Sequence, residues 1–255
     1  MAEVRVALVT GAAQGIGKAI AMRLADDGLD VALNDLPQKL GQVQAVVNAI
    51  RAKGRRALAV CGDASNEDEV VDMIKTTVGE LGGLDVMVAN AGIVSYASII
   101  DTSVESWEKI MSVNARSVLL AIKHAARQMI VQGRGGRIIA ASSVAGKRGM
   151  QTVGAYSASK FAVRGLAQTA AVELRAHNIT VNCYCPGIIL TDMSLHDEDD
   201  LNGGPGSTAA QIVGLSGIKP ATPDVIASFV SYIARPESYY ITGQSVNVSG
   251  GLLMD

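Results

Sequence analysis

The stretch Thr10–Gly17, with the sequence TGAAQGIG, lies between the apolar run Val4–Val9 and a segment in which Ile16, Ile20 and Leu24 recur at helical spacing. A glycine-rich turn between a strand and a helix is a natural anion site, because backbone N–H groups and the positive end of the helix dipole face the ligand. The spacing Gly-x-x-x-Gly-x-Gly differs from the common dinucleotide fingerprint. The turn predicts a phosphate-binding site, although three glycines also suit a purely structural turn.

Short apolar runs and helical patterns alternate along the whole chain. The runs after the first are rich in Val and Ile; they are Val31–Asn34, Ala57–Cys61, Leu84–Ala89, Arg137–Ser142, Ile179–Cys185 and Ser245–Val248. Runs that are apolar on both faces are typical of strands buried in a parallel sheet, and apolar residues at i, i+3 and i+4 between them indicate helices. The alternation predicts one α/β domain, residues 1–255, with a doubly wound parallel sheet of about seven strands and helices on both faces.

The composition argues against several classes of protein. Of the 255 residues, 49% are hydrophobic and 18% are charged, with a formal net charge of −2, so the chain can bury a core and lacks the basic excess expected of a nucleic-acid binder. No apolar run approaches the roughly 18 residues of a membrane span, and the first run is too short for a signal sequence. The cysteines, Cys61, Cys183 and Cys185, favour a reducing, cytoplasmic location and show no metal-ligand spacing.

Asp35 follows the second apolar run, about twenty residues after the glycine-rich turn. An acidic side chain at this point can accept hydrogen bonds from adenosine ribose hydroxyls and would repel a 2′-phosphate. Neither Leu36 nor Pro37 is basic, and Gln14 in the turn is neutral. These residues predict NAD in preference to NADP, unless Asp35 merely ends a strand.

Tyr156 and Lys160 lie four residues apart in a stretch with helical composition, residues 155–174, and therefore share one face of a helix. A phenol ordinarily has a pKa near ~10, and a nearby ammonium favours the phenolate. We therefore expect Lys160 to lower the pKa of Tyr156 toward neutrality, so that Tyr156 can exchange a proton with a substrate. Ser142-Ser143 follows another apolar run, at the edge where ligands bind in open α/β sheets.

Taken together, these motifs resemble the short-chain dehydrogenase/reductase family along essentially the whole chain. The family pattern Thr-Gly-x-x-x-Gly-x-Gly matches Thr10–Gly17, and Asn-Asn-Ala-Gly matches residues 89–92 except that Ala89 replaces the first Asn. The resemblance implies a Rossmann-type fold and a catalytic set of Asn114, Ser143, Tyr156 and Lys160, where Ser143 is chosen over Ser142 because it lies thirteen residues before the tyrosine. Tyr156 would be the general acid and base, Lys160 would lower its pKa and bind the nicotinamide ribose, Ser143 would bind the substrate oxygen, and Asn114 would hold a proton-relay water.

The resemblance also implies a set of cofactor contacts. It places the adenine at Asp63 and Ala64, and the nicotinamide carboxamide and pyrophosphate at Ile189 and Thr191. The whole expected cofactor set is Gly11, Gln14, Gly15, Ile16, Gly17, Asp35, Asp63, Ala64, Asn90, Ala91, Gly92, Tyr156, Lys160, Pro186, Gly187, Ile189 and Thr191. The predicted activity is NAD(H)-dependent interconversion of a secondary alcohol and a ketone.

Two alternative activities remain open at this stage. One is an NADPH-dependent 3-oxoacyl-thioester reductase, against which Asp35 argues. The other is a nucleotide-binding sensor without catalysis, against which the presence of Tyr156 and Lys160 argues. The helix sequence around residues 159–166 is similar to acetoin reductases and butanediol dehydrogenases, but sugar alcohols, steroids and other secondary alcohols also remain possible as substrates.

Substrate contacts and assembly are less closely defined by the sequence. Residues 194–218 are polar and glycine-rich, with an acidic run at 197–200, and suit either a solvated surface loop or a mobile flap over the site. Met150, Gln151, Val153 and Gly154 precede Tyr156 and are expected on the substrate side. Trp107 is expected to pack in the core or in an interface, and the family resemblance implies a homotetramer with no nucleic-acid or membrane partner.

Overall fold

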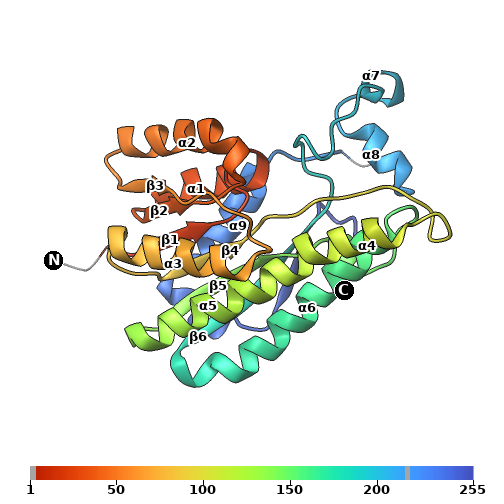
Figure 1. Cartoon of the computed structure of the whole chain (residues 1–255). Coiled ribbons are helices and arrows are strands. Elements are labelled where there is room, and N and C mark those ends of the chain that lie inside the picture. Colours follow the sequence, from red (N-terminus) through yellow and green to blue (C-terminus); the bar gives the residue numbers. More distant parts are fainter. Residues whose placement is uncertain (1–3, 216–218, 255) are drawn as a thin grey trace.

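A seven-stranded parallel sheet forms the centre of the molecule, with the order β3-β2-β1-β4-β5-β6-β7 (Figure 1). The computed structural model describes residues 4–215 and 219–254. The strands are β1 (Val6–Val9), β2 (Asp30–Leu33), β3 (Ala57–Ala59), β4 (Val86–Ala89), β5 (Gly136–Ala141), β6 (Ile179–Pro186) and β7 (Ser245–Val248). The predicted doubly wound sheet is confirmed, with strand ends shifted by a residue or two from the apolar runs.

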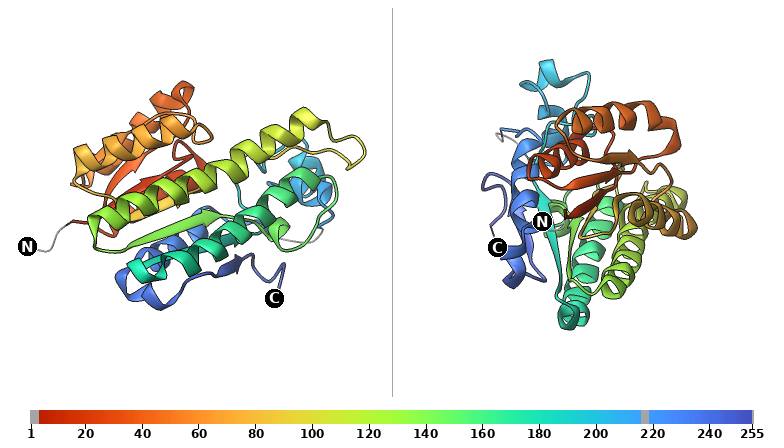
Figure 2. Two further views of the ribbon diagram at one scale, coloured as in Figure 1. Left: turned by 60° about the horizontal axis from the view of Figure 1, so that its bottom comes forward. Right: turned by 90° about the vertical axis from the view of Figure 1, so that its left-hand side faces the viewer.

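Helices cover both faces of this sheet (Figure 2). One face packs against α1 (Gly15–Asp26), α2 (Leu40–Ala52) and α9 (Asp224–Ala234), and the other against α3 (Glu67–Leu81), α5 (Ser117–Gln132) and α6 (Gly154–Leu174). The short helices α4 (Val104–Met111), α7 (Asp199–Asn202) and α8 (Ser207–Ile212) lie at or beyond the carboxyl ends of the strands (Figure 1).

The two cores are separated by the sheet itself. In β1, Val6 and Leu8 belong to the core under α3, α5 and α6, whereas Ala7 and Val9 belong to the core under α1, α2 and α9. Successive side chains of a strand point to opposite faces, so a strand buried on both faces must be apolar at every position. This requirement explains why the strands appear in the sequence as continuous apolar runs.

The chain reverses its direction of winding between β3 and β4. Starting from β1, the strands β2 and β3 are added on one side, and β4 to β7 are then added on the other. The connections that leave the carboxyl ends of β1 and β4 therefore diverge, and ligands bind at such a switch point in open α/β sheets. The glycine-rich turn after β1 lies at this point.

Glycine is required at particular positions of the turn. Gly11 and Gly15 have φ values of +65° and +53°, in the left-handed region. A Cβ atom at Gly17 would overlap the carbonyl oxygen of Gly11 and the side-chain amide of Asn90. The first turn of α1 has no side-chain cap, so its backbone N–H groups remain free to bind an anion.

One local prediction needs correction, and one local feature was not predicted. Trp107 is 36% exposed on α4 and does not belong to the core, so its packing in an interface remains a prediction. Asn114 lies in a π-helical turn, Ser112–Arg116, that joins α4 to α5. A π-turn inserted between helices is a local irregularity that side-chain periodicity does not reveal.

The contact at Gly17 leads to a stability prediction. We expect Gly17→Ala to lower the free energy of unfolding by roughly 1–3 kcal/mol, because the added methyl group meets rigid backbone. Gly41→Ala is the matched control: Gly41 lies in α2, has a negative φ and leaves open space for a Cβ. It should leave stability unchanged or raise it by up to about 1 kcal/mol. Urea titration followed by circular dichroism measures both, and equal effects in the two variants would contradict the assigned role of Gly17.

Candidate active site

A cavity of about 590 Å³ opens along the carboxyl ends of the strands. It is lined by the glycine-rich turn and by the segments that follow β2, β3, β4, β5 and β6. All of the site residues expected from the sequence line this cavity except Asn114, which is fully buried behind it. Residues that are far apart in the sequence are thus brought to one edge of the sheet.

Asn90 fixes the position of the glycine-rich turn. Its side-chain amide donates hydrogen bonds to the carbonyl oxygens of Thr10 (2.9 Å) and Gly11 (3.3 Å). The side-chain oxygen of Asn90 accepts a bond of 2.8 Å from the Tyr184 hydroxyl in β6. Thr10 Oγ1 in turn accepts bonds of 3.0 Å from the backbone N–H groups of Asn90 and Ala91. The side chain of Asn90 therefore acts on the turn, and Tyr184 is a supporting residue that the sequence analysis missed.

Asp35 lies at the end of the cavity beside β2. Its carboxylate accepts hydrogen bonds from the backbone N–H of Ala13 (3.0 Å) and of Leu36 (2.9 Å). These bonds hold the carboxylate at the cavity wall beside the glycine-rich turn. The position fits an acceptor for the ribose hydroxyls of a dinucleotide.

Lys39 also lines this end of the cavity, and its ammonium group donates a hydrogen bond of 2.7 Å to Gln14 Oε1. Only Leu36 and Pro37 were expected as positions for a cation after β2, so Lys39 was not predicted. A short 3-10 helix, Pro37–Lys39, turns the chain back toward the glycine-rich turn. This turn cannot be recognised from residue spacing alone.

Asp63 and Ala64 form the next part of the cavity wall, after β3. The carboxylate of Asp63 accepts hydrogen bonds from the backbone N–H and the hydroxyl of Ser65, each 2.8 Å long. Asn34 donates from its side chain to the carbonyl oxygens of Val60 (3.0 Å) and Gly62 (2.9 Å). The loop that carries Asp63 is therefore held to the end of β2.

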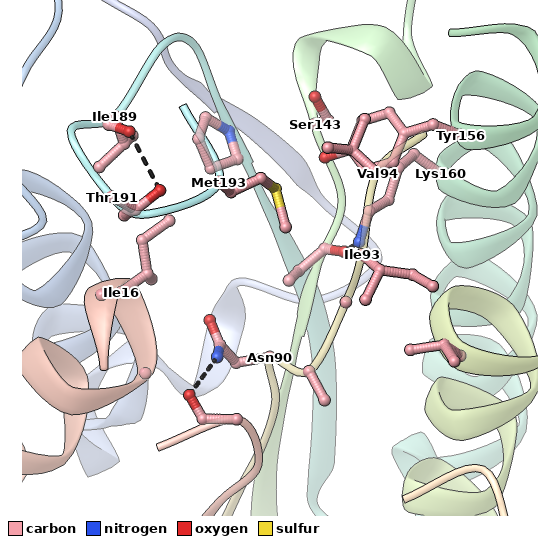
Figure 3. Close-up of a pocket in the computed structure, with 18 of the residues that line it drawn as sticks. Ile16, Asn90, Ile93, Val94, Ser143, Tyr156, Lys160, Ile189, Thr191 and Met193 are labelled. Carbon is pink, nitrogen blue, oxygen red and sulfur yellow. Dashed lines mark hydrogen bonds between the residues drawn. The ribbon is translucent and has the colours of Figure 1, made fainter. Parts of the chain in front are cut away.

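Tyr156, Lys160 and Ser143 meet at the middle of the cavity (Figure 3). Tyr156 and Lys160 project from one face of α6, with the lysine Nζ 5.5 Å from the centre of the tyrosine ring. The same Nζ donates a hydrogen bond of 2.8 Å to the carbonyl oxygen of Ala141 at the end of β5. Ser143 follows β5 directly, so the strand end and the helix face each other across the site.

Burial sets the ionisation of this pair in the cofactor-free protein. Desolvation raises the pKa of Tyr156 to about 12, and its hydrogen bond with Ser143 acts in the opposite direction. Desolvation also lowers the pKa of Lys160 to about 8. Burial therefore keeps the pKa of Tyr156 above neutrality in this structure, and the effect of Lys160 on that pKa stays a prediction.

Asn114 is held entirely by protein groups. Its side-chain oxygen accepts a hydrogen bond of 2.8 Å from the backbone N–H of Ile93, and its amide donates to Ile93 O (2.9 Å) and Ser159 Oγ (3.1 Å). A Cβ on Gly92 would lie 3.3 Å from the Asn114 oxygen and 3.4 Å from Lys160 Nζ. Asn114 thus connects the π-turn to the loop after β4 and to α6, and it lies close to the lysine with both N–H groups of its side-chain amide engaged.

The segment after β6 lines the cavity and lies against the glycine-rich turn. A Cβ on Gly15 would lie 3.1 Å from the Thr191 methyl group, so the two segments are in close contact. Thr191 Oγ1 donates a bond of 3.4 Å to Ile189 O, and the Ser194 hydroxyl donates a bond of 2.7 Å to the same oxygen (Figure 3). The sequence analysis did not identify Ser194 as a residue that stabilises this loop.

The segment expected as a loop or flap is structured within its described part, residues 194–215; residues 216–218 lie outside the described residues. The carboxylate of Asp199 accepts hydrogen bonds from the backbone N–H of His196 (3.1 Å), Gly206 (2.8 Å) and Thr208 (2.9 Å). These bonds hold the pKa of Asp199 well below its usual value. Asp199 is therefore an internal anchor of α7 and α8, which the acidic composition of residues 197–200 did not indicate.

Of the residues expected on the substrate side, Met150 and Val153 line the cavity. Gln151 instead donates a hydrogen bond of 3.3 Å to Ile212 O in α8. Gly154 is the first residue of α6 and is not among the lining residues. Of these four residues of the turn before α6, two therefore belong to the cavity wall.

Comparison with known proteins identifies the family. The family model described as short chain dehydrogenase matches residues 5–202. A short-chain dehydrogenase/reductase of Armillaria gallica is 48% identical over 98% of this chain and 97% of its own length. The chain belongs to the short-chain dehydrogenase/reductase family.

Two further relatives have names that describe their activity. The L-2,3-butanediol dehydrogenase of Corynebacterium glutamicum is 39% identical over 98% of both chains. The crystal structure of acetoin dehydrogenase from Enterobacter cloacae superposes with a TM-score of 0.85 at 35% identity, and covers 99% of this chain and 96% of the other. The protein is accordingly an oxidoreductase that uses NAD(P) and interconverts a secondary alcohol and a ketone.

The described residues were also compared with the requirements of a membrane-spanning helix and of a metal site. None of the helices within residues 4–215 and 219–254 is both long and apolar enough to cross a membrane. In the same part of the chain, His, Cys, Asp and Glu side chains form no group of three or more that could hold a metal ion.

The buried lysine predicts a pH-dependent stability. The pKa of Lys160 is about 8 in the folded protein against an ordinary value of 10.5, so the folded state binds fewer protons than the unfolded state between these pH values. Lys160 by itself should therefore contribute up to about 3 kcal/mol of stability as the pH rises through this window, partly offset by Cys183, whose raised pKa acts in the opposite direction. Lys160→Met should lack this gain and should lose activity. Calorimetry at pH 7 and pH 10 measures the free energy of unfolding of both proteins. A difference between wild type and Lys160→Met that is the same at both pH values would contradict the prediction.

Proposed function

We propose that this protein is an NAD(H)-dependent dehydrogenase/reductase with Tyr156 as its general acid and base. The observation that carries the proposal is the meeting of Tyr156, Lys160 and Ser143 in the cavity that also contains the uncapped N-terminus of α1. Free N–H groups at the start of α1 fit a pyrophosphate, and Asp35 fits the adenosine ribose. The residues present therefore fit a nicotinamide dinucleotide, which supplies the hydride when it is bound.

In ketone reduction, the substrate oxygen would lie between Ser143 and Tyr156. The Ser143 hydroxyl would donate a hydrogen bond to this oxygen and stabilise the negative charge that develops there. Tyr156 would transfer its phenol proton to the oxygen as hydride reaches the carbonyl carbon. A pKa near 12 keeps Tyr156 protonated in the free protein, which is the form needed for this direction.

After transfer, the Tyr156 phenolate must regain a proton. Lys160 lies next to its ring and, when protonated, would stabilise the phenolate and bind the nicotinamide ribose. We infer that Asn114 helps to order the proton path behind Lys160, since both lie against Gly92. The Asn114 amide is fully bonded, so its part in a water relay would use the irregular backbone of the π-turn.

The preference for NAD over NADP is supported by the fixed carboxylate of Asp35, which would repel a 2′-phosphate. Lys39 lies at the same end of the cavity and would attract a 2′-phosphate once the carboxylate is neutralised. The competing activity, NADPH-dependent reduction of a 3-oxoacyl thioester, is disfavoured by the same carboxylate. The competing role as a nucleotide-binding sensor without catalysis is disfavoured by the intact catalytic set.

A homotetramer is the proposed assembly. Large apolar side chains are exposed on the neighbouring helices α4, α5 and α6: Val104, Trp107, Leu119, Ile130, Val131, Phe161 and Val172. Such exposure on one side of the molecule is typical of a subunit interface. A cytoplasmic location is likewise proposed, supported by three free cysteines.

The reaction class is tested by NADH oxidation with a panel of ketones. We expect turnover with NADH in the wild type and a loss of at least about 100-fold in Tyr156→Phe, because the phenol proton is removed. Tyr239→Phe is the control, since Tyr239 is 67% exposed and does not line the cavity. Tight NADH binding without turnover of any ketone would instead support the sensor.

Cofactor choice is tested by Asp35→Asn. This change removes the charge and keeps an acceptor for one of the two backbone N–H groups, that of Ala13 or that of Leu36. We expect the NADP/NAD ratio of kcat/KM to rise by about 10- to 100-fold. Asp26→Asn, an exposed change on α1, serves as the control. An unchanged ratio would show that Asp35 does not face the ribose.

The assembly is tested by light scattering at micromolar concentration. We expect a mass about four times the chain mass of 26.4 kDa. Phe161→Asp should lower this mass, because it puts a charge into the proposed apolar interface. A wild-type monomer would refute the tetramer.

A further inference from the structure

The part of the cavity around Tyr156 that faces away from the glycine-rich turn is walled by three segments. They are residues 93–96 after β4, residues 144–153 before α6 and residues 193–215 after β6; Lys109 of α4 and Val113 of the π-turn also line the cavity. The cavity-lining residues of these segments, here called the substrate wall, are Ile93, Val94, Tyr96, Val144, Ala145, Met150, Val153, Met193, Ser194, Ala209, Val213 and Leu215. Met193 extends from its loop toward the space beside Ser143 and Tyr156 (Figure 3).

Within the described part of the chain, the substrate wall carries two polar side chains, Tyr96 and Ser194. The Ser194 hydroxyl is occupied, because it donates to Ile189 O at 2.7 Å and accepts from the Thr191 N–H at 3.1 Å. The Tyr96 hydroxyl has no hydrogen-bond partner among the described residues, and the side chain is 37% exposed. Tyr96 is also near enough to Tyr156 to contribute to its raised pKa. Tyr96 therefore offers a free hydrogen-bonding group within an otherwise apolar wall.

The orientation of Tyr96 is set by the segment that carries α7 and α8. The His196 ring packs against the Tyr96 ring, with centroids 5.9 Å apart and planes at 58°. The backbone of His196 is itself bonded to the Asp199 carboxylate at 3.1 Å. The contact with His196 therefore restricts the orientation of the Tyr96 ring. A partly fixed donor in an apolar site is the usual arrangement for orienting a ligand.

We infer that the substrate is an apolar ketone or secondary alcohol with a skeleton larger than four carbons and one further oxygen that binds the Tyr96 hydroxyl. This inference rests on the proposed function. The two residues that follow Ser143, Val144 and Ala145, line the cavity, and their side chains carry no hydrogen-bonding group for a second oxygen close to the reacting carbon. A four-carbon skeleton would also leave most of the substrate wall without contact. A larger skeleton fills the wall and places its second oxygen at Tyr96, remote from the reacting carbon.

The size requirement is tested with wild-type enzyme and NADH. The probes are diacetyl and acetoin as small substrates, and 2-decalone and a hydroxylated 2-decalone as bicyclic ones. We expect kcat/KM to be at least about 10-fold higher for the bicyclic ketones, because each buried methylene group adds to transition-state binding. A higher kcat/KM for diacetyl or acetoin would overturn the inference and leave the proposed function intact.

The role of Tyr96 is tested with Tyr96→Phe, which removes one oxygen and keeps the ring against His196. We expect kcat/KM for the hydroxylated decalone to fall about 3- to 10-fold, as for loss of one hydrogen bond between neutral groups, and that for 2-decalone to stay unchanged. Tyr239→Phe is the matched control and should alter neither. Equal losses for the two ketones would indicate a structural role, and no loss for either would show that Tyr96 does not contact substrate.

Binding to an inactive complex separates this inference from the proposed function. Calorimetry measures the binding of 2-decalol and its hydroxylated form to Tyr156→Phe loaded with NAD⁺, with and without Tyr96→Phe. Tighter binding of the hydroxylated alcohol that disappears with Tyr96→Phe would support the inference even if the wild type turned over no ketone. Equal binding of the two alcohols would overturn the inference whether or not the wild type is active.

Discussion

The close approach of α1 to the end of β1 is the constraint on which the rest of the site depends. Gly17 lies so near the Gly11 carbonyl that no side chain fits between them, and the Asn90 amide bonds to the same turn from the end of β4. This contact directs the N-terminus of α1 into the gap between diverging connections. Tyr184 extends the network to β6, so the phosphate site and the central strands are positioned together.

Burying the ionisable side chains of Tyr156 and Lys160 costs solvation free energy. Lys160 is almost completely buried, and burial shifts the pKa values of both Lys160 and Tyr156 away from those favouring their charged forms. A preorganised site of this kind lowers the stability of the folded state, because water that would solvate the charges has been replaced by fixed groups. The same fixed groups favour the reaction. The Ala141 carbonyl compensates in part by accepting a hydrogen bond from the lysine. The strand end and the helix therefore determine the proton chemistry jointly.

The substrate side is built differently from the cofactor side. The proposed cofactor contacts come from short loops directly attached to strand ends, whereas the substrate wall comes from longer segments held by their own polar anchors. Asp199 organises α7 and α8 through three backbone N–H groups, and Thr152 donates from its hydroxyl to Ile212 O at 3.1 Å. Such segments can change in sequence without disturbing the sheet, which explains how one fold serves many alcohols and ketones.

The sequence alone determined the strand and helix order, the glycine-rich turn and the i, i+4 placement of Tyr156 and Lys160, because all of these depend on local spacing or on apolar periodicity. It did not show Lys39 beside Gln14, Tyr184 beneath Asn90, Tyr96 against His196 or Asp199 as an internal anchor. Each of these is a contact between side chains from different segments, or the result of a turn with no spacing signal. The direction of the Tyr156 pKa was also decided by the tertiary structure, since desolvation depends on the packing of the whole site and not on the i, i+4 spacing of the lysine.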